Sequence, residues 1–129
     1  MSKFVPYHGP SIQEAKKLVT GISDPMKRYE EVTLYVEKGF VYDYVRAIMI
    51  PKRNELPDVD RCWKTRMGIC LDISAMTVGM LRAVGLKSYL CIGRADRQCH
   101  AWVETIVNGK TRRYDHRRKA KTYKIERRY

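Results

Sequence analysis

The stretch that decides the fold reads Met67-Gly-Ile-Cys70-Leu-Asp-Ile73 and places a cysteine at the start of a predicted helix. Apolar residues then recur at the spacing of one helix face, at Ile69, Ile73, Met76, Met80 and Val84. Gly85 followed by Leu86 is typical of a helix end. Met67, Met76 and Met80 fit core packing at this spacing better than an adaptable binding surface.

A β-hairpin is predicted after this helix. Residues 88–93 form a short apolar run that reads as a strand, and residues 100–107 read as the next one. Asn108-Gly109 is the strongest turn signal in the chain, because both residues tolerate the positive φ angles of a two-residue hairpin turn. Residues 110–116 then return as the partner strand, and Tyr123 and Ile125 indicate a last edge strand.

The register of this hairpin brings two polar side chains together. With a two-residue turn, Val107 pairs with Lys110, so that Trp102 faces Asp115. Because side chains alternate between the faces of a strand, His100 and Asp115 then lie on the same side as diagonal neighbours. Their α-carbons are expected about 5.5–8 Å apart, within reach of an imidazole–carboxylate hydrogen bond.

Cys70, His100 and Asp115 are the three groups that a thiol nucleophile needs: a sulfur, a base and a carboxylate that orients the base. At the helix start, unpaired amide N–H groups favour a thiolate, and the Cys70 amide is placed to stabilise an oxyanion. Trp63 and Tyr42 are candidates for the second oxyanion donor. From spacing alone the competing interpretation stays open: a buried, inert cysteine, a packed histidine and an aspartate in a turn or salt bridge.

The N-terminal part reads as helical. Ser11-Ile-Gln-Glu14 has the capping-box pattern, and Asp24 before Pro25 marks a second helix start, with Gly39 as its end. Residues 40–50 allow either a continued helix or a strand. Residues 51–67 carry two prolines and much charge with little periodicity, so they are expected to form a loop.

Length and composition fit one globular domain spanning residues 1–129, since the chain is 44% hydrophobic. No apolar run is long enough to cross a bilayer, and no signal peptide is evident at the N-terminus. We therefore expect no membrane association. The compartment stays open: cytoplasmic if the chain is full length, secreted if an export signal has been removed. The oligomeric state also stays open.

The net charge of +12 is concentrated near the C-terminus. Residues 112–129 hold nine Lys and Arg against Asp115 and Glu126, which gives 9 − 2 = +7. Residues 117–129 are expected to form a basic C-terminal tail. Such a segment can attract a polyanion or nucleic acid, weakly, or can simply be a solvated tail.

The cysteines do not indicate a disulfide framework or a metal site. Cys62, Cys70, Cys91 and Cys99 lack Cys-x-x-Cys spacing, and Cys91 reads as a small buried residue. Convergence of Cys99, His100 and His116 on zinc is the remaining alternative. His116 is expected on the opposite sheet face from Asp115, exposed to solvent. We expect no cofactor and no metal.

The ordered motifs resemble the transglutaminase-like core domain: Gly68-Ile-Cys70-Leu-Asp72, Leu81-Arg-Ala-Val-Gly-Leu86, His100-Ala-Trp-Val-Glu104 and Tyr114-Asp115. The match covers about residues 24–116. It implies an α+β, papain-like fold in which N-terminal helices and the cysteine-bearing helix pack on a small antiparallel sheet. It also implies Cys70 as nucleophile, His100 as base and Asp115 as orienting group, with Trp102 and Arg82 at structural positions.

The family that the motifs resemble includes calcium-dependent protein crosslinkers, peptide N-glycanases and small microbial cysteine peptidases or amidases. Glu55, Asp58 and Asp60 form only a loose acidic group, which argues against the calcium-activated type. We expect a cysteine peptidase or amidase that acts on a protein or peptide substrate through a thioester. The alternatives are a protein transamidase, or a catalytically idle domain that binds nucleic acid or another polyanion.

Overall fold

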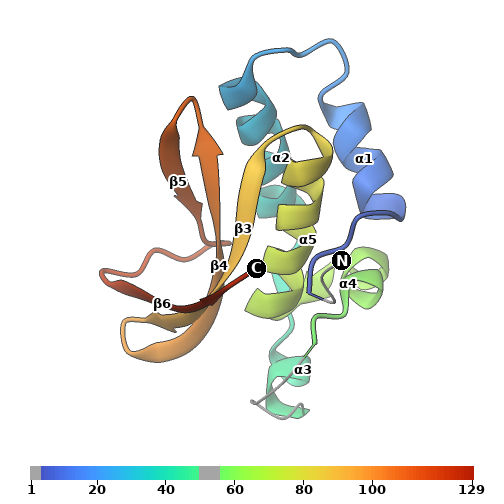
Figure 1. The fold of residues 1–129 in the computed structure, drawn as a ribbon. Helices are drawn as coiled ribbons and strands as arrows, with labels where there is room; N and C mark the ends of the chain where they lie inside the picture. Colours follow the sequence, from blue (N-terminus) through green and yellow to red (C-terminus); the bar gives the residue numbers. More distant parts are fainter. Residues whose placement is uncertain (1–3, 50–55) are drawn as a thin grey trace.

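The computed structural model describes residues 4–49 and 56–129 and shows a sheet, a central helix and an outer set of helices (Figure 1). Its main sheet has four strands in the order β5-β4-β3-β6, with all neighbours antiparallel. These strands are β3 (Lys87–Ala95), β4 (Gln98–Val107), β5 (Lys110–Tyr114) and β6 (Tyr123–Arg128). The expected α+β arrangement on a small antiparallel sheet is confirmed.

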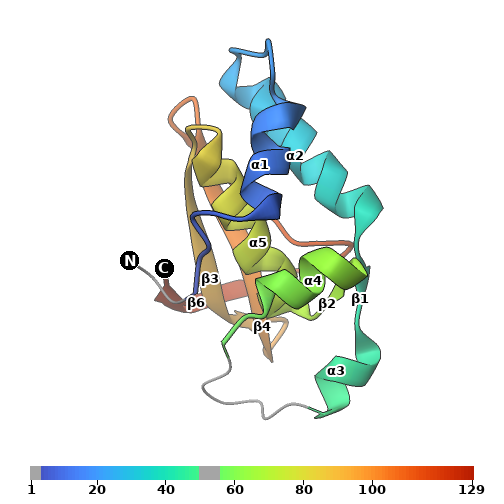
Figure 2. The same ribbon diagram turned by 90° about the vertical axis from the view of Figure 1, so that its right-hand side faces the viewer.

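Helix α5 (Cys70–Ala83) forms the centre of the core. The sheet covers one side of it, and α1 (Pro10–Leu18), α2 (Pro25–Gly39) and α4 (Val59–Thr65) cover the rest, as the two ribbon views show (Figures 1 and 2). Every residue from 71 to 81 is therefore buried, rather than one face of the helix as the periodicity predicted. Met76 and Met80 lie in the core, but the same prediction for Met67 is wrong, because its side chain is 38% exposed.

The two N-terminal helices begin in different ways. Helix α1 starts at Pro10, one residue before the predicted cap, and the buried Ser11 caps nothing. Proline suits a first-turn position because its missing N–H would have no helical partner there. Helix α2 begins as predicted, and its Asp24 carboxylate accepts a hydrogen bond from the Lys27 amide at 3.0 Å.

Across residues 4–49 and 56–129, no helix has both the length and the apolar character needed to cross a membrane.

The segment between α2 and α5 holds more structure than the sequence indicated. It contains β1 (Val41–Tyr42) and α3 (Tyr44–Met49), so the strand alternative holds for two residues. The helix does not continue, because α2 ends at Gly39 and α3 is a separate helix. Strand β1 pairs in parallel with β2 (Met67–Gly68), directly before α5. The predicted loop at residues 51–67 is wrong where α4 forms. That helix has a single buried residue, Cys62, and so gives no periodic pattern. Residues 50–55 lie outside the described part.

The hairpin has the predicted register. Val107 pairs with Lys110, and Asn108 and Gly109 adopt φ angles of 52° and 77° between them. The strand ends at Tyr114, two residues earlier than predicted. The predicted edge strand is confirmed as β6, which pairs with β3 and so continues the sheet into residues 123–128.

Arg82 joins the end of α5 to two strands. Its guanidinium donates from Nε to the Ser88 carbonyl at 2.9 Å and from Nη2 to the Tyr129 carbonyl at 3.0 Å. Tyr129 also stacks on Phe4, with ring centroids 4.2 Å apart. The expected structural role of Arg82 therefore has a direct cause: it holds β3 and the segment after β6 against the helix.

Gly68 allows the closest approach in this part of the core. A Cβ atom there would lie 2.8 Å from Cys62 Sγ and 3.0 Å from Asp72 Cβ. We expect Gly68→Ala to lower the free energy of unfolding by about 1–3 kcal/mol, because the packed neighbours would have to shift. Urea denaturation measures the change. Gly39→Ala is the matched control, since no atom lies within 4 Å of the position that its methyl group would take. Equal stability of the two variants would contradict the packing argument.

Candidate active site

Cys70, His100 and Asp115 line one cleft of about 540 Å³, here called the thiol cleft. Each comes from a different element: the first residue of α5, the early part of β4 and the residue after β5. The cleft is also lined by residues of β1 and α3, including Tyr42 and Tyr44, and by residues 115–118. The three residues predicted from the sequence are thus brought together.

His100 and Asp115 form a direct, largely buried contact. His100 Nε2 lies 2.8 Å from Asp115 Oδ1, and the two side chains are 9% and 5% exposed. Asp115 follows the last paired residue of β5 rather than standing opposite Trp102, yet the diagonal proximity expected from the register is present. A carboxylate on Nε2 fixes the ring orientation and directs Nδ1 to any further partner.

The same cleft places Cys70 beside His100. Burial on its own would lower the pKa of His100, but the nearby Asp115 and Cys70 side chains outweigh it. Together they raise the pKa of His100 to about 9. The geometry therefore favours a protonated imidazole between a sulfur and a carboxylate.

Tyr123 adds a fourth residue that the sequence did not reveal as part of the site. Its hydroxyl donates to Asp115 Oδ2 at 2.9 Å and accepts from the Ala120 amide at 3.0 Å. The fully buried Trp102 packs edge-on against the Tyr123 ring, with centroids 5.0 Å apart. The only sequence signal was the expected edge strand. Nothing local shows that this strand pairs with β3 and reaches Asp115.

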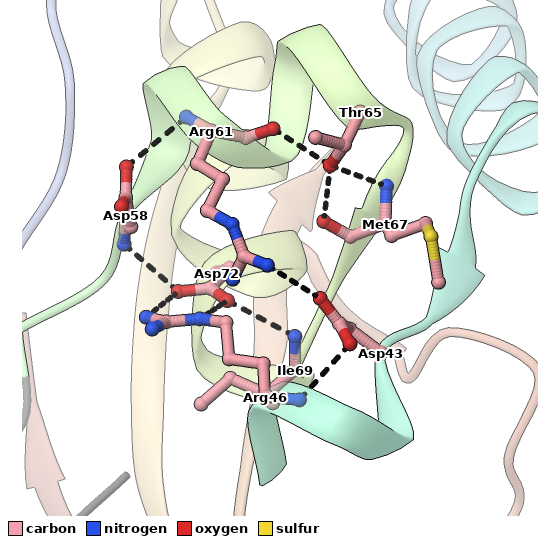
Figure 3. A network of polar contacts seen from close by, with 8 residues as sticks. All are labelled: Asp43, Arg46, Asp58, Arg61, Thr65, Met67, Ile69 and Asp72. Atoms are coloured by element: carbon pink, nitrogen blue, oxygen red, sulfur yellow. Dashed lines mark hydrogen bonds and ion pairs between the residues drawn. The ribbon is translucent and has the colours of Figure 1, made fainter. Parts of the chain in front are cut away.

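A second carboxylate, Asp72, holds the segment that leads into Cys70 (Figure 3). It is 1% exposed and accepts hydrogen bonds from the Ile69 amide at 3.0 Å and the Asp58 amide at 2.8 Å. Arg46 adds two more, from Nε at 2.8 Å and from Nη2 at 3.0 Å. Residues on α3 and α5 and the residue before α4 therefore meet at one buried charge, close to the N-terminus of α5, where a negative charge is favoured.

Asp43 extends this network to the paired strands. Its amide donates to the Gly68 carbonyl at 2.9 Å, its Oδ1 accepts from the Arg46 amide at 3.0 Å, and its Oδ2 lies 3.4 Å from Arg61 Nη2 (Figure 3). The paired strands β1 and β2 and the start of α3 are thereby tied to the start of the cysteine helix.

The structure also shows where three neighbouring residues lie: His116 and the two candidate oxyanion donors, Tyr42 and Trp63. The exposure predicted for His116 is wrong: it is half-buried beside Asp115 on the thiol cleft, and its Nε2 is buried with no hydrogen-bond partner among the described residues. Burial lowers the pKa of this ring. Of the two candidate oxyanion donors, Tyr42 lines the cleft. Trp63 instead packs against Phe40 and under the Arg66 guanidinium.

The described cysteines are all free thiols, and Cys62 and Cys91 are buried. Within residues 4–49 and 56–129, no three His, Cys, Asp or Glu side chains are grouped to hold a metal ion, including Cys99, His100 and His116. Asp58, one of the loose acidic group, caps α4 by accepting from the Arg61 amide at 3.0 Å. Glu55, another member, lies outside the described residues.

Comparison with known proteins identifies the family. The model of the transglutaminase-like superfamily matches residues 12–116, so the chain belongs to this superfamily. This group comprises cysteine peptidases and transglutaminases, and the chain has its fold. The match begins earlier than residue 24, where the resemblance of the sequence motifs starts, because it includes most of α1.

Solved structures with the same fold have low sequence identity to the chain. A protein from Cytophaga hutchinsonii, provisionally named a cysteine protease, superposes with a TM-score of 0.65 at 18% identity over 88% of this chain and 39% of its own. The periplasmic domain of TgpA from Pseudomonas aeruginosa gives 0.60 at 19% identity over 88% and 44%. A provisionally named protease from Parabacteroides distasonis gives 0.62 at 18% identity over 80% and 22%. The chain thus spans less than half the length of each. No curated protein matched the chain.

We predict that Asp72→Ala lowers the free energy of unfolding by about 3 kcal/mol, because buried donors lose a charged acceptor. The amide hydrogen of Ile69 should also exchange faster, since it loses its acceptor. Urea denaturation and hydrogen exchange measure the two effects. Asp60→Ala, in the exposed first turn of α4, is the control and should change neither. An Asp72→Ala protein with unchanged Ile69 protection would show that this carboxylate does not hold the loop.

The raised pKa of His100 predicts a pH-dependent stability. The group binds its proton with a pKa of about 9 when folded, against an ordinary value of 6.5. Its contribution is therefore fully present below about pH 6.5 and is lost as the pH rises through about 9. We expect the stability difference between the parent and His100→Gln to fall by on the order of 3 kcal/mol between pH 6 and pH 10. A difference that stays constant over this range would contradict the assignment.

Proposed function

We propose that the chain is a thiol hydrolase of amide or peptide bonds, with Cys70 as nucleophile, His100 as acid and base, and Asp115 as the orienting group. The observation that carries this proposal is that one imidazole, hydrogen-bonded to a buried carboxylate at 2.8 Å, lines the same cleft as the cysteine at the start of α5. A structural histidine needs only the carboxylate. A catalytic histidine needs the carboxylate and the cysteine, in a cleft that a substrate can enter.

In the first half of the reaction the Cys70 sulfur attacks the substrate carbonyl carbon, and the carbonyl oxygen becomes an oxyanion. His100, protonated in the resting pair, gives its proton to the departing amine as the carbon–nitrogen bond breaks. The product of this step is a thioester on Cys70. In the second half His100 takes a proton from water, and the resulting hydroxide attacks the thioester carbon. The carbon–sulfur bond breaks, which returns the thiolate to Cys70 and releases a carboxylic acid.

The oxyanion has two proposed donors. Cys70 is the first residue of α5, so its amide N–H has no carbonyl partner within the helix. Tyr42 is the second, because it lines the same cleft. Burial raises the pKa of Tyr42, and the charges of Cys70 and Asp72 raise it further, so its hydroxyl keeps the hydrogen that it would donate.

Hydrolysis is favoured over transamidation by the openness of the cleft to water. The exposed residues that line it include Gln98, Cys99, Arg117 and Tyr44, the last with 73% of its surface accessible. A transamidase has to protect its thioester from water until an amine arrives. Activity as a protein transamidase is the alternative, and it would appear as amine incorporation when a primary amine is added to the reaction.

Tyr123 and Trp102 are proposed as positioning residues, since neither contacts the sulfur. Tyr123→Phe keeps the ring against Trp102 and removes the hydroxyl, with its hydrogen bonds to Asp115 and to the Ala120 amide. The expected result is a fall in kcat with KM nearly unchanged, smaller than the fall in Asp115→Asn, because Asp115 keeps its bond to His100.

Alkylation by iodoacetamide between pH 4 and pH 9, followed by peptide mapping, tests the activated pair without a known substrate. We expect Cys70 to react at pH 6 at least about tenfold faster than the exposed Cys99, because the thiolate is the reacting form. His100→Ala should abolish this difference. Equal rates for Cys70 and Cys99 in the parent protein would refute the proposal.

The remaining cysteines and one tyrosine serve as controls in the same molecule. Burial raises the pKa of Cys62 and of Cys91 to about 12, so both should stay unlabelled at neutral pH while the fold is intact. Labelling of either one marks unfolding and invalidates that variant. Tyr89→Phe matches Tyr123→Phe on the neighbouring strand, and no hydrogen bond of its hydroxyl occurs in the described part; it should leave Cys70 reactivity unchanged.

The second candidate function is a catalytically idle domain that binds a polyanion through its basic C-terminal residues. The excess of Lys and Arg over residues 112–129 is the observation that favours it. A gel shift with an oligonucleotide over a salt titration tests it, and binding that falls steeply with salt would support it.

A further inference from the structure

We propose that the substrate carries an acidic side chain next to the scissile amide, which a basic rim beside the thiol cleft recognises. The basic rim consists of Arg113, Arg117, Arg118 and Lys119. This inference rests on the proposed function and adds the chemical class of its substrate: acidic peptides.

The basic rim connects two hollows. Arg117 and Arg118 line the thiol cleft, and together with Asp115 they also line a second hollow. Arg113 and Lys119 belong to that second hollow alone. A substrate chain that extends from Cys70 across residues 115–118 therefore passes Arg117 and Arg118 first and then Arg113 and Lys119.

Carboxylates nearby do not neutralise these cations. Asp115 is bonded to His100 and Tyr123. Glu37, which also lines the second hollow, already accepts from the Tyr114 hydroxyl at 2.7 Å and from the Arg117 amide at 3.1 Å. Among the described residues, no member of the basic rim forms an ion pair with a carboxylate.

The contacts that the rim does make leave its charge free. Arg117 donates from Nε to the Glu37 carbonyl at 3.0 Å, and Arg118 donates from Nη2 to the Ala95 carbonyl at 3.4 Å. Arg113 lies over the Tyr123 ring, 3.9 Å from its centroid. Backbone carbonyls and a ring hold these side chains in place without cancelling a full charge, so an arriving carboxylate meets positioned donors.

Another part of the cleft lining is uncharged. It is formed by Val41, Tyr42 and Tyr44, of which Tyr44 is largely exposed. The two parts of the lining thus differ in the side chains that they suit: an apolar or aromatic group against Tyr44, and an acidic group against the basic rim. A basic substrate would be repelled by the rim and by the net charge of +12.

A peptide fits this surface better than a nucleic acid. Single strands bind largely by stacking bases on aromatic rings, and the three tyrosines of the C-terminal segment are already engaged. Tyr114 is bonded to Glu37, Tyr123 lies between Trp102 and Arg113, and Tyr129 stacks on Phe4. The basic C-terminal segment therefore offers none of its own tyrosines for stacking, and its charge is gathered beside a thiol.

Two alkylating reagents that differ only in charge test the recognition at Cys70. Iodoacetate is an anion and iodoacetamide is neutral, so the ratio of their rates at Cys70 reports the local field. We expect this ratio to exceed that of free N-acetylcysteine and to fall about threefold in Arg118→Gln at low salt, the size of one charge at roughly 6 Å in water. The iodoacetamide rate serves as the reference, because it reports any change in the thiol itself. Arg127→Gln, exposed on β6 and on neither hollow, is the matched control and should keep the parent ratio.

This design separates the two proposals. Slow reaction of Cys70 with both reagents contradicts the activated thiol, whatever the ratio. Fast reaction of Cys70 with no preference for iodoacetate, or an equal loss of preference in Arg118→Gln and Arg127→Gln, overturns the basic rim while leaving the thiol intact.

Binding to the Cys70→Ala protein gives the second measurement. A labelled peptide containing glutamates should bind at least about tenfold more tightly than the same peptide with glutamines, since about two charges are paired. Arg117→Gln combined with Arg118→Gln should remove most of that difference. Equal binding of the two peptides, or displacement of the acidic peptide by a single-stranded oligonucleotide at lower concentration than by unlabelled peptide, would overturn the proposal.

Discussion

The buried carboxylate of Asp72 is the constraint on which the site depends. It collects four hydrogen bonds from Ile69, Asp58 and Arg46, and so joins segments that are far apart in the chain. Because it lies in the first turn of α5, its negative charge also interacts favourably with the positive end of the helix dipole. Cys70 lies between Ile69 and Asp72 in the chain, and the Asp72 carboxylate is bonded to the Ile69 amide. The position of Cys70 is therefore set by hydrogen bonds as well as by packing.

The parts predicted correctly from the sequence are those set by short-range rules. Helical spacing from Cys70 and the turn at Asn108 and Gly109 fix the cysteine helix and the register, and the register alone places His100 near Asp115. Helix α4 was missed because its one buried residue, Cys62, leaves no repeat to detect.

The parts that were not predicted depend on contacts between distant segments. Tyr123 reaches Asp115 because β6 pairs with β3, across a separation that no local pattern encodes. His116 turns into the cleft because β5 ends two residues earlier than its pattern indicated. Met67, spaced like a core residue, is half-exposed because it belongs to a two-residue strand before the helix.

The place of Tyr123 in the chain has a consequence for biosynthesis. During translation the sulfur, the imidazole and the carboxylate are all made before the tyrosine that completes their hydrogen bonding, and before the strand that closes that side of the sheet. A nascent chain in which residue 123 is still inside the ribosome therefore lacks the hydrogen bond from Tyr123 to Asp115. The hydrogen bonding of Asp115 is complete only after β6 has paired with β3.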